Sequence, residues 1–283
     1  MLERPLPLRL MSPLRTLQKF HALFLRDFAI ARGYRGAFVL EMFQALFGVA
    51  TFYYLSRFVQ SPELTRALPQ GGNYFAFALI GFVLFDYLGV ALDSFDKTLE
   101  DARQNRTLEA LLVTQTTLPV MLFGSLIYPF ATTLLRTLVY LAWGVLLFGF
   151  SLRGANWPGA IIVLLASVLA FSGLGVLSTS YVLLFKRGNP AKWLLLGVSG
   201  FVGGMMYPVS VLPGYLQVVA RLIPLTYSLQ GIRAALLGGE SLRLLWPSII
   251  ALLIFAAVLL PVSFFVFAHA LRRTKVTGTL THI

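Results

Sequence analysis

The sequence predicts an all-α integral membrane protein with six transmembrane helices and both termini in the cytoplasm. Only 12% of its 283 residues are charged and 58% are hydrophobic, whereas soluble domains carry about 25% charged residues. Six apolar stretches reach the length of about 20 residues that a helix needs to cross a bilayer. We also expect an amphipathic interfacial helix before the first span and external re-entrant half-helices before the last.

Residues 1–36 predict a cytosolic arm, because Leu17, Phe20, Leu23 and Phe28 recur at helical spacing among basic residues. A soluble helix packed on protein is the alternative. The transmembrane domain, 37–268, follows, with spans predicted at 37–58, 74–95, 121–150, 159–185, 192–212 and 245–268. The third and fourth are long enough that we expect them to tilt or protrude. Residues 269–283 form a basic tail.

The distribution of basic residues predicts the orientation. Sixteen of the 23 lysines and arginines fall in the arm, in the loops at 96–118 and 186–192, and in the tail. These regions all lie on one side of the predicted membrane, which the positive-inside tendency makes cytoplasmic. The net charge of +12 therefore comes from residues that flank the spans, and it does not indicate a nucleic-acid partner.

Several function classes are excluded by what the sequence lacks. There is no cysteine, and the three histidines lie near the two ends of the chain, so no metal site is expected. No G-x-x-x-x-G-K-[ST] phosphate loop occurs, so this chain should not bind or hydrolyse ATP alone. We find no nucleophile with a matching base. The chain is not expected to be an enzyme by itself.

One charged and then amphipathic helix, 103–117, is predicted on the cytoplasmic side between the second and third spans. Its leucine face is Leu108, Leu111, Leu112 and Leu118; Arg103, Arg106 and Glu109 lie toward its start, and Thr114 and Gln115 begin its polar end. Such a helix can dock into a groove on another protein. It can equally pack on its own spans or among lipid headgroups, and periodicity alone does not separate these interpretations.

Two opposite charges are predicted deep inside neighbouring spans. Asp86 lies about ten residues and Arg136 about fifteen residues from the cytoplasmic ends of their spans, which is roughly 15 and 22 Å. Because charge in a bilayer is costly, we expect the two side chains to pair or share a network. Their role stays open between a packing device and a substrate path in which Arg136 attracts an anionic headgroup or phosphate.

Prolines break the chain before the last span. Pro208, Pro213 and Pro224 divide this region into two short helices, because a helix loses a hydrogen bond at proline. The external elbow, 213–240, is predicted to dip into the membrane against protein. Its candidate site residues include Arg221, Tyr227 and Arg233. A structural plug without substrate contact is the alternative.

Glycines give the fifth predicted span a close-packing face, at Gly197, Gly200, Gly203 and Gly204. Small residues at this spacing let two helix backbones approach each other. The sequence leaves open whether the partner is a span of the same chain or a second copy.

Two motifs resemble the membrane subunit of bacterial ABC exporters of the drug, polysaccharide and teichoic-acid type, the type-2 ABC permeases. The segment Thr107–Thr114, "TLEALLVT", is similar to the family's T-L-E-x-L-L-x-T, although Arg106 and Gln115 stand where glycine and proline are common. Residues 208–238 are similar to a proline-rich family motif. Its matching residues here are Pro208, Leu212, Pro213, Pro224, Leu225, Thr226, Tyr227 and Arg233.

The resemblance implies a permease subunit of an ATP-driven exporter in the bacterial cytoplasmic (inner) membrane. It implies two copies of this chain with two copies of a separate ATP-binding cassette subunit, which would bind ATP and Mg²⁺; this chain would bind no cofactor. The residues that would contact the ATPase are Arg103, Arg106, Thr107, Leu108, Glu109, Leu111, Leu112, Thr114, Gln115, Lys186 and Arg187.

The cargo is not determined by the sequence. The entry to the first span, "YRGAFVLEMFQALFG", lacks the Y-x-x-x-x-L-G-x-x-W pattern of polysaccharide-exporting members. This favours a hydrophobic or amphipathic substrate, such as a drug-like molecule, a lipid or a lipid-linked glycan. The main alternative is an ion-coupled secondary transporter that uses Glu41, Asp86 and Asp93 as proton carriers.

Overall fold

The structure is a computed structural model that describes residues 35–59, 68, 73–104, 118–185 and 189–276. Within these ranges all regular elements are helices, as predicted. They are α2 (Arg35–Val59), α4 (Tyr74–Gln104), α6 (Leu118–Phe148), α7 (Trp157–Phe185), α8 (Pro190–Val202), the 3₁₀ turn η1 (Val209–Val211), α9 (Gly214–Arg221), α10 (Pro224–Leu236) and α11 (Leu242–Val276).

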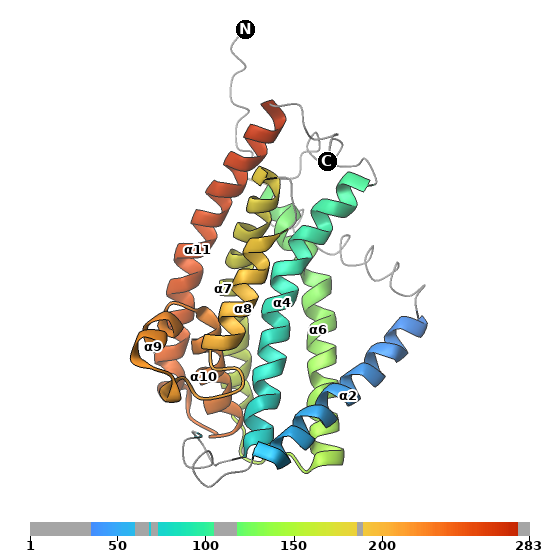
Figure 1. The fold of residues 1–283 in the computed structure, drawn as a ribbon, viewed down its shortest axis with the longest axis vertical. Helices are drawn as coiled ribbons and strands as arrows, with labels where there is room; N and C mark the ends of the chain where they lie inside the picture. Colours follow the sequence, from blue (N-terminus) through green and yellow to red (C-terminus); the bar gives the residue numbers. More distant parts are fainter. Residues whose placement is uncertain (1–34, 60–67, 69–72, 105–117, 186–188, 277–283) are drawn as a thin grey trace.

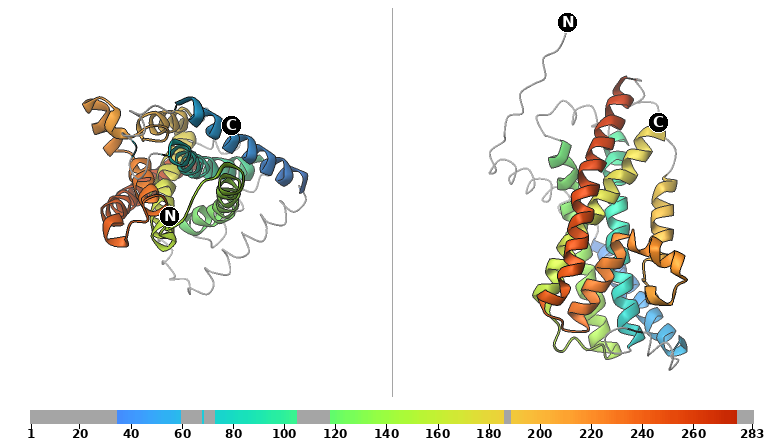
Figure 2. Two further views of the ribbon diagram at one scale, coloured as in Figure 1. Left: turned by 90° about the horizontal axis from the view of Figure 1, so that it is seen from below. Right: turned by 90° about the vertical axis from the view of Figure 1, so that its left-hand side faces the viewer.

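The long helices form one bundle. Figure 1 shows α4, α6, α7 and α11 along the long axis, with α2 crossing obliquely and ending near the start of α4. A ring contact between Tyr53 and Phe75, with centroids 5.6 Å apart, joins α2 to α4 there. Seen along the bundle, α9 lies at the rim, on a different side from α6 (Figure 2).

Four helices are long and apolar enough to cross a membrane. They are Tyr74–Lys97, Leu126–Phe148, Trp157–Phe185 and Leu242–Arg273, and they correspond to the predicted second, third, fourth and sixth spans. The helix predicted at 37–58 is present as α2, but it is not among these four, and its sequence includes Glu41 and Gln44. Helices α6 and α11 run through Pro129, Pro247 and Pro261, which shows that proline does not end every helix here.

The helix predicted at 192–212 ends ten residues early, at Val202. With 13 residues, α8 is about 20 Å long and cannot cross the hydrocarbon core by itself. The chain turns at Gly203 and Gly204, and Gly204 adopts φ +89°, a conformation that glycine tolerates and other residues rarely adopt. The prediction was wrong because apolar residues continue past this turn, so hydrophobicity did not mark the helix end.

Helix α7 is the central helix of the bundle. Of its 29 residues 16 are buried, which is more than one face and shows that it packs against protein on several sides. A Cβ added at Gly173 would lie 2.7 Å from Cβ of Leu259 in α11. One added at Gly175 would lie 2.2 Å from the carbonyl oxygen of Ala91 in α4. These two glycines therefore let α7 approach both neighbours closely.

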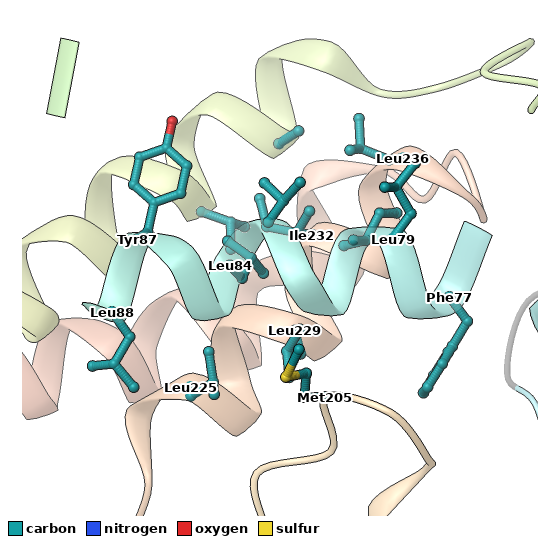
Figure 3. Close-up of a cluster of buried hydrophobic side chains, with 14 of the residues drawn as sticks. Phe77, Leu79, Leu84, Tyr87, Leu88, Met205, Leu225, Leu229, Ile232 and Leu236 are labelled. Carbon is teal, nitrogen blue, oxygen red and sulfur yellow. The ribbon is translucent and has the colours of Figure 1, made fainter. Parts of the chain in front are cut away.

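Helix α10 packs into the same core although its sequence is amphipathic. Leu225, Leu229 and Ile232 of α10 are buried beside α4, whose Leu79 and Leu84 are buried in the same cluster (Figure 3). The predicted elbow is thus present as two short helices, α9 and α10, and the second is part of the core.

The close approach of α4 and α7 leads to a first prediction. Gly175→Ala should lower the apparent melting temperature, because overpacking of a core costs about 1–3 kcal/mol. Gly197→Ala is the matched control, since it is also helical and has nothing within 4 Å of its added Cβ. Thermal unfolding of both variants, purified in detergent and followed by tryptophan fluorescence, checks this. Equal melting temperatures would contradict the packing argument.

Candidate functional site

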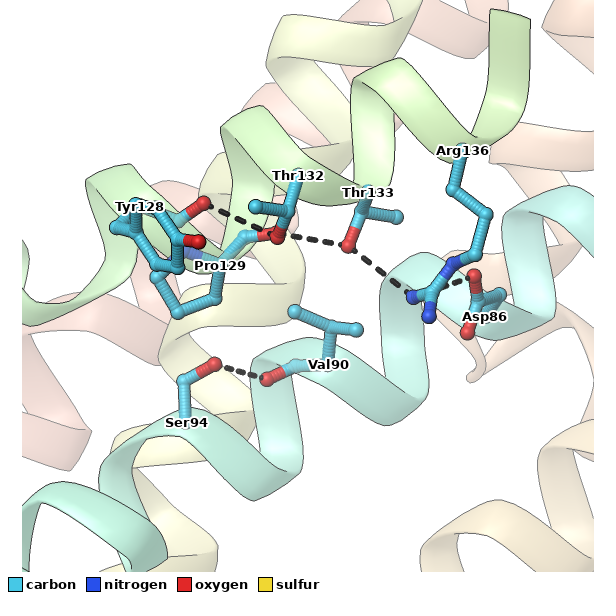
Figure 4. A network of polar contacts seen from close by, with 8 residues as sticks. All are labelled: Asp86, Val90, Ser94, Tyr128, Pro129, Thr132, Thr133 and Arg136. Carbon is cyan, nitrogen blue, oxygen red and sulfur yellow. Dashed lines mark hydrogen bonds and ion pairs between the residues drawn. The ribbon is translucent and has the colours of Figure 1, made fainter. Parts of the chain in front are cut away.

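The predicted pairing of Asp86 and Arg136 is confirmed. Oδ2 of Asp86 in α4 lies 2.9 Å from Nη2 of Arg136 in α6, and the two side chains are 24% and 25% exposed (Figure 4). The depths inferred from sequence were comparable, and α4 and α6 are neighbours, so the charges meet. Because each side chain is partly exposed, the ion pair can be reached from outside the bundle.

The surroundings of the pair are only partly polar. Nη2 of Arg136 also lies 3.4 Å from the hydroxyl of Thr133, which donates to the carbonyl of Pro129 at 2.8 Å. The Nε of Arg136 is buried and has no hydrogen-bond partner among the described residues. Next to Asp86 in α4, the ring of Tyr87 stacks on that of Phe130 in α6, with centroids 6.1 Å apart. The guanidinium thus has donor capacity that these protein groups do not use.

Arg233 has a role that the sequence did not indicate. It is 5% exposed, and its guanidinium donates to the carbonyl oxygens of Phe77 (2.9 Å), Gly204 (2.8 Å) and Met205 (2.8 Å). It also lies 3.3 Å from the ring centroid of Phe77. A Cβ at Gly81 would lie 2.1 Å from the Met205 carbonyl, so glycine is needed for this approach. We call this group the Arg233 clamp.

The other elbow candidates are arranged around α9. The backbone carbonyl of Arg221 accepts a hydrogen bond of 3.1 Å from the Tyr227 hydroxyl, and the Thr226 hydroxyl donates to the Ala220 carbonyl at 2.8 Å. Pro213 precedes α9, Pro224 begins α10 and Pro208 precedes η1. These contacts shape the elbow, and none of them joins it to Asp86 or Arg136.

A polar cluster at the other end of α4 was missed by the sequence reasoning. Asp96 accepts hydrogen bonds from the Thr179 hydroxyl (2.5 Å) and from Nδ2 of Asn189 (2.6 Å), which also donates to the Ser178 hydroxyl at 2.7 Å. Lys192 forms an ion pair with Asp93. Available signals were the Asn-Pro helix start at 189–190 and the polar run Ser178–Thr179–Ser180 inside an apolar span.

The predicted coupling residues lie mostly outside the described ranges. Arg106, Thr107, Leu108, Glu109, Leu111, Leu112, Thr114 and Gln115 fall in 105–117, and Lys186 and Arg187 fall in 186–188. Arg103 belongs to the last turn of α4. Within the described residues, no group of three His, Asp or Glu side chains could hold a metal ion.

A comparison with known families identifies the chain. The profile of the ABC-2 type transporter matches residues 18–237, from the N-terminal arm through α10. The chain belongs to this family. The match covers α4, α6, α7 and the elbow as far as residue 237, and it includes the matching residues of both motifs noted in the sequence. Family membership and four membrane-length helices make this chain a multi-pass membrane protein of the permease type.

Three relatives show how far this chain has diverged from named proteins of similar sequence. Nodulation protein J of Rhizobium meliloti (strain 1021) is 28% identical over 180 residues, which are 60% of this chain and 64% of that protein. Nodulation protein J of Sinorhizobium fredii (strain NBRC 101917 / NGR234) is 28% identical over 197 residues, which are 67% of this chain and 71% of that protein. Inner membrane transport permease YadH of Escherichia coli (strain K12) is 23% identical over 169 residues, which are 60% of this chain and 65% of that permease. The chain thus spans less than two thirds of the first and third of these relatives.

Proposed function

We propose that this ABC-2 family chain is the transmembrane permease subunit of an ATP-driven exporter in the bacterial inner membrane. The match over 18–237 carries the proposal, and the name of YadH, an inner membrane transport permease, supports the location. ATP and Mg²⁺ would bind to a separate ATP-binding subunit, because this sequence has no phosphate loop. Two copies of the permease would work with two copies of that subunit.

The positions of four helix ends support the proposed contact between the coupling residues and the ATPase. Helix α4 ends at Gln104 and α6 begins at Leu118, and these two helix ends lie at one end of the bundle. The end of α7 at Phe185 and the start of α8 at Pro190 lie at the same end (Figure 1). Closure of the ATPase dimer would therefore push on α4, α6, α7 and α8 together, through the leucine face at 108–112 and through Lys186 and Arg187.

The proposed cargo is hydrophobic or amphipathic. Among the described residues, Asp86 and Arg136 form an ion pair well inside α4 and α6, next to a largely apolar core. The guanidinium of Arg136, whose side chain is 25% exposed, would suit an anionic headgroup or phosphate at the edge of the α4–α6 contact. The elbow, with Tyr227, Arg221 and the proline turns, would form the external end of the path.

The alternative is an ion-coupled secondary transporter, and one observation weighs against it. Two of the three carboxylates proposed as proton carriers, Asp86 and Asp93, form ion pairs with Arg136 and Lys192. A proton carrier at either position would have to separate from its cationic partner in each transport cycle.

The test is recovery of the ATPase with the tagged chain. Pull-down from native membranes should recover an ATP-binding subunit, and Leu108→Asp with Leu112→Asp should lower its recovery at least about tenfold, because an aspartate in an apolar groove costs more than 1.4 kcal/mol. Leu108→Met with Leu112→Met is the matched control and should retain binding, since methionine keeps the volume and the apolar face. Absence of any ATP-binding subunit with the unchanged chain would favour the secondary transporter.

A further inference from the structure

Helix α8 is attached to α4 by polar contacts at both of its ends. At its start, Asn189 and Lys192 contact Asp96 and Asp93 of α4. Just beyond its end lies the Arg233 clamp. There one guanidinium donates hydrogen bonds to the carbonyls of Gly204 and Met205 and to that of Phe77 in α4. The two ends of α8 are thus fixed to the two halves of α4.

Between these ends, the attachment of α8 is weaker. Gly200 faces the ring of Phe85 in α4, with its added Cβ 3.1 Å from that ring, whereas Gly197 has no neighbour within 4 Å. The close-packing glycines predicted on this segment therefore contact the same chain at Gly200. Trp193 and Leu194 on the outer side of α8 are 72% and 68% exposed. Apolar contacts alone therefore do not determine the position of α8 relative to α4.

Asp96 is the residue that joins three helices at the start of α8. One carboxylate oxygen accepts from Thr179 of α7, and the other accepts from Nδ2 of Asn189. The other amide atom of Asn189, Oδ1, accepts from the backbone N–H of Lys192 at 2.9 Å and so caps α8. Hydrogen bonds to a carboxylate are about twice as strong as neutral ones and are directional, so they specify a position as well as a contact.

Stability of the α4–α7 contact does not require this cluster. Those helices already meet along buried apolar residues and at Gly175, where their backbones touch. Helix α8 packs on the core through Val202 and Leu195, but its glycine nearest to α4, Gly200, meets the side chain of Phe85 and not the α4 backbone. The Asp96 cluster therefore acts chiefly on the placement of α8 relative to α4.

We propose that Asp96 and Asn189 are positioning residues that make α4 and α8 move as one unit. Displacement of α4 at its coupling end would then be carried along α8 to the 203–205 turn and the Arg233 clamp. This proposal rests on the proposed function, because the displacement comes from an ATPase that contacts the segment after Gln104.

The experiment uses a cysteine reporter beside the clamp. The chain contains no cysteine, so Met206→Cys introduces a single thiol at a residue that is 38% exposed and follows the 203–205 turn. The detergent-purified complex with its ATPase is labelled with a maleimide, with and without Mg-ATP and vanadate. We expect the labelling rate to change at least about fivefold on nucleotide trapping, the lower range for coupled sites.

Two variants remove the cluster in different ways. Asp96→Ala removes the carboxylate, and Asn189→Ser keeps a good N-cap for α8 while removing the amide that reaches Asp96 and Ser178. In both variants, the labelling rates with and without Mg-ATP and vanadate should differ by less than about twofold, which means that most of the coupling is lost. Ser180→Ala is the matched control and should keep the full effect, because Ser180 neighbours Thr179 but donates only within α7, to Val176 at 2.7 Å.

The outcomes separate the two proposals. If no ATPase is recovered with the reporter chain, the proposed function fails. If the ATPase is recovered but the reporter ignores nucleotide, or if both variants keep the full nucleotide effect, the positioning role of Asp96 and Asn189 is overturned and the exporter proposal stands. If Asp96→Ala cannot be purified, Asn189→Ser and Thr179→Val are compared instead. The positioning role is overturned if both of these variants keep the full change in labelling rate.

Discussion

Arg233→Met should sharply reduce the yield of folded protein, although methionine keeps much of the volume of the arginine side chain. The guanidinium is buried and satisfies the Gly204 and Met205 carbonyls, which lie outside any helix. Among the described residues no backbone N–H donates to these two oxygens. An unsatisfied buried polar group costs about 1–3 kcal/mol, so the loss of two partners should cost about 3 kcal/mol or more.

The measurement is the monodisperse fraction and the apparent melting temperature after purification in detergent. Arg221→Met is the control, because Arg221 is an exposed arginine of the neighbouring helix and engages Tyr227 only through its backbone carbonyl. Arg233→Lys should be intermediate, since one ammonium group cannot reproduce the planar fork that reaches three carbonyls. A stability of Arg233→Met equal to that of Arg221→Met would show that the clamp contributes nothing.

Arg136→Leu should destabilise the protein more than the double change of Asp86→Leu with Arg136→Leu. Removal of one partner leaves an uncompensated carboxylate among apolar spans, whereas removal of both leaves two apolar side chains in contact. Breaking a buried pair costs about 3–5 kcal/mol, and the partial exposure of this pair places our expectation near the lower limit.

Thermal unfolding of the two single variants and the double variant forms a cycle that isolates the pair. We expect a coupling between the two positions of at least about 1 kcal/mol. Equal damage from Arg136→Leu and from the double change would show that Asp86 and Arg136 do not stabilise each other. Leu138→Ala, an exposed position on the same helix, controls for an unspecific effect of changing α6.

Much of the helical architecture follows from local pattern. The presence and approximate positions of α4, α6, α7 and α11 were predictable because crossing a bilayer demands a run of apolar residues that few other structures need. The predicted ends of α4 and α11 were wrong, because both helices continue past the apolar run, to Gln104 and Val276. The break into α9 and α10 followed from Pro213 and Pro224. The pairing of Asp86 with Arg136 could be inferred from depth alone, because two neighbouring spans leave an unpaired charge few alternatives.

The end of α8 and the role of Arg233 could not be inferred in this way. Hydrophobicity does not distinguish a helix from a buried turn, so the turn at Gly203–Gly204 was hidden in an apolar run. Arg233 looked like a substrate-path candidate at the elbow. Its partners are backbone carbonyls from segments 28 or more residues away. Every residue has such a carbonyl, so the sequence does not show which of them would accept a hydrogen bond from Arg233.

The sequence by itself determined that this chain spans a membrane, where most of its long helices lie, and which family it resembles. Only the tertiary structure decided that α7 is central, that Gly175 and Gly81 are contact points, and that Asp96 meets Asn189 across 93 residues. The physical reason is the range of the interactions. Helix formation and membrane insertion depend on residues within a few turns, whereas these contacts depend on which helix faces meet after the bundle has packed.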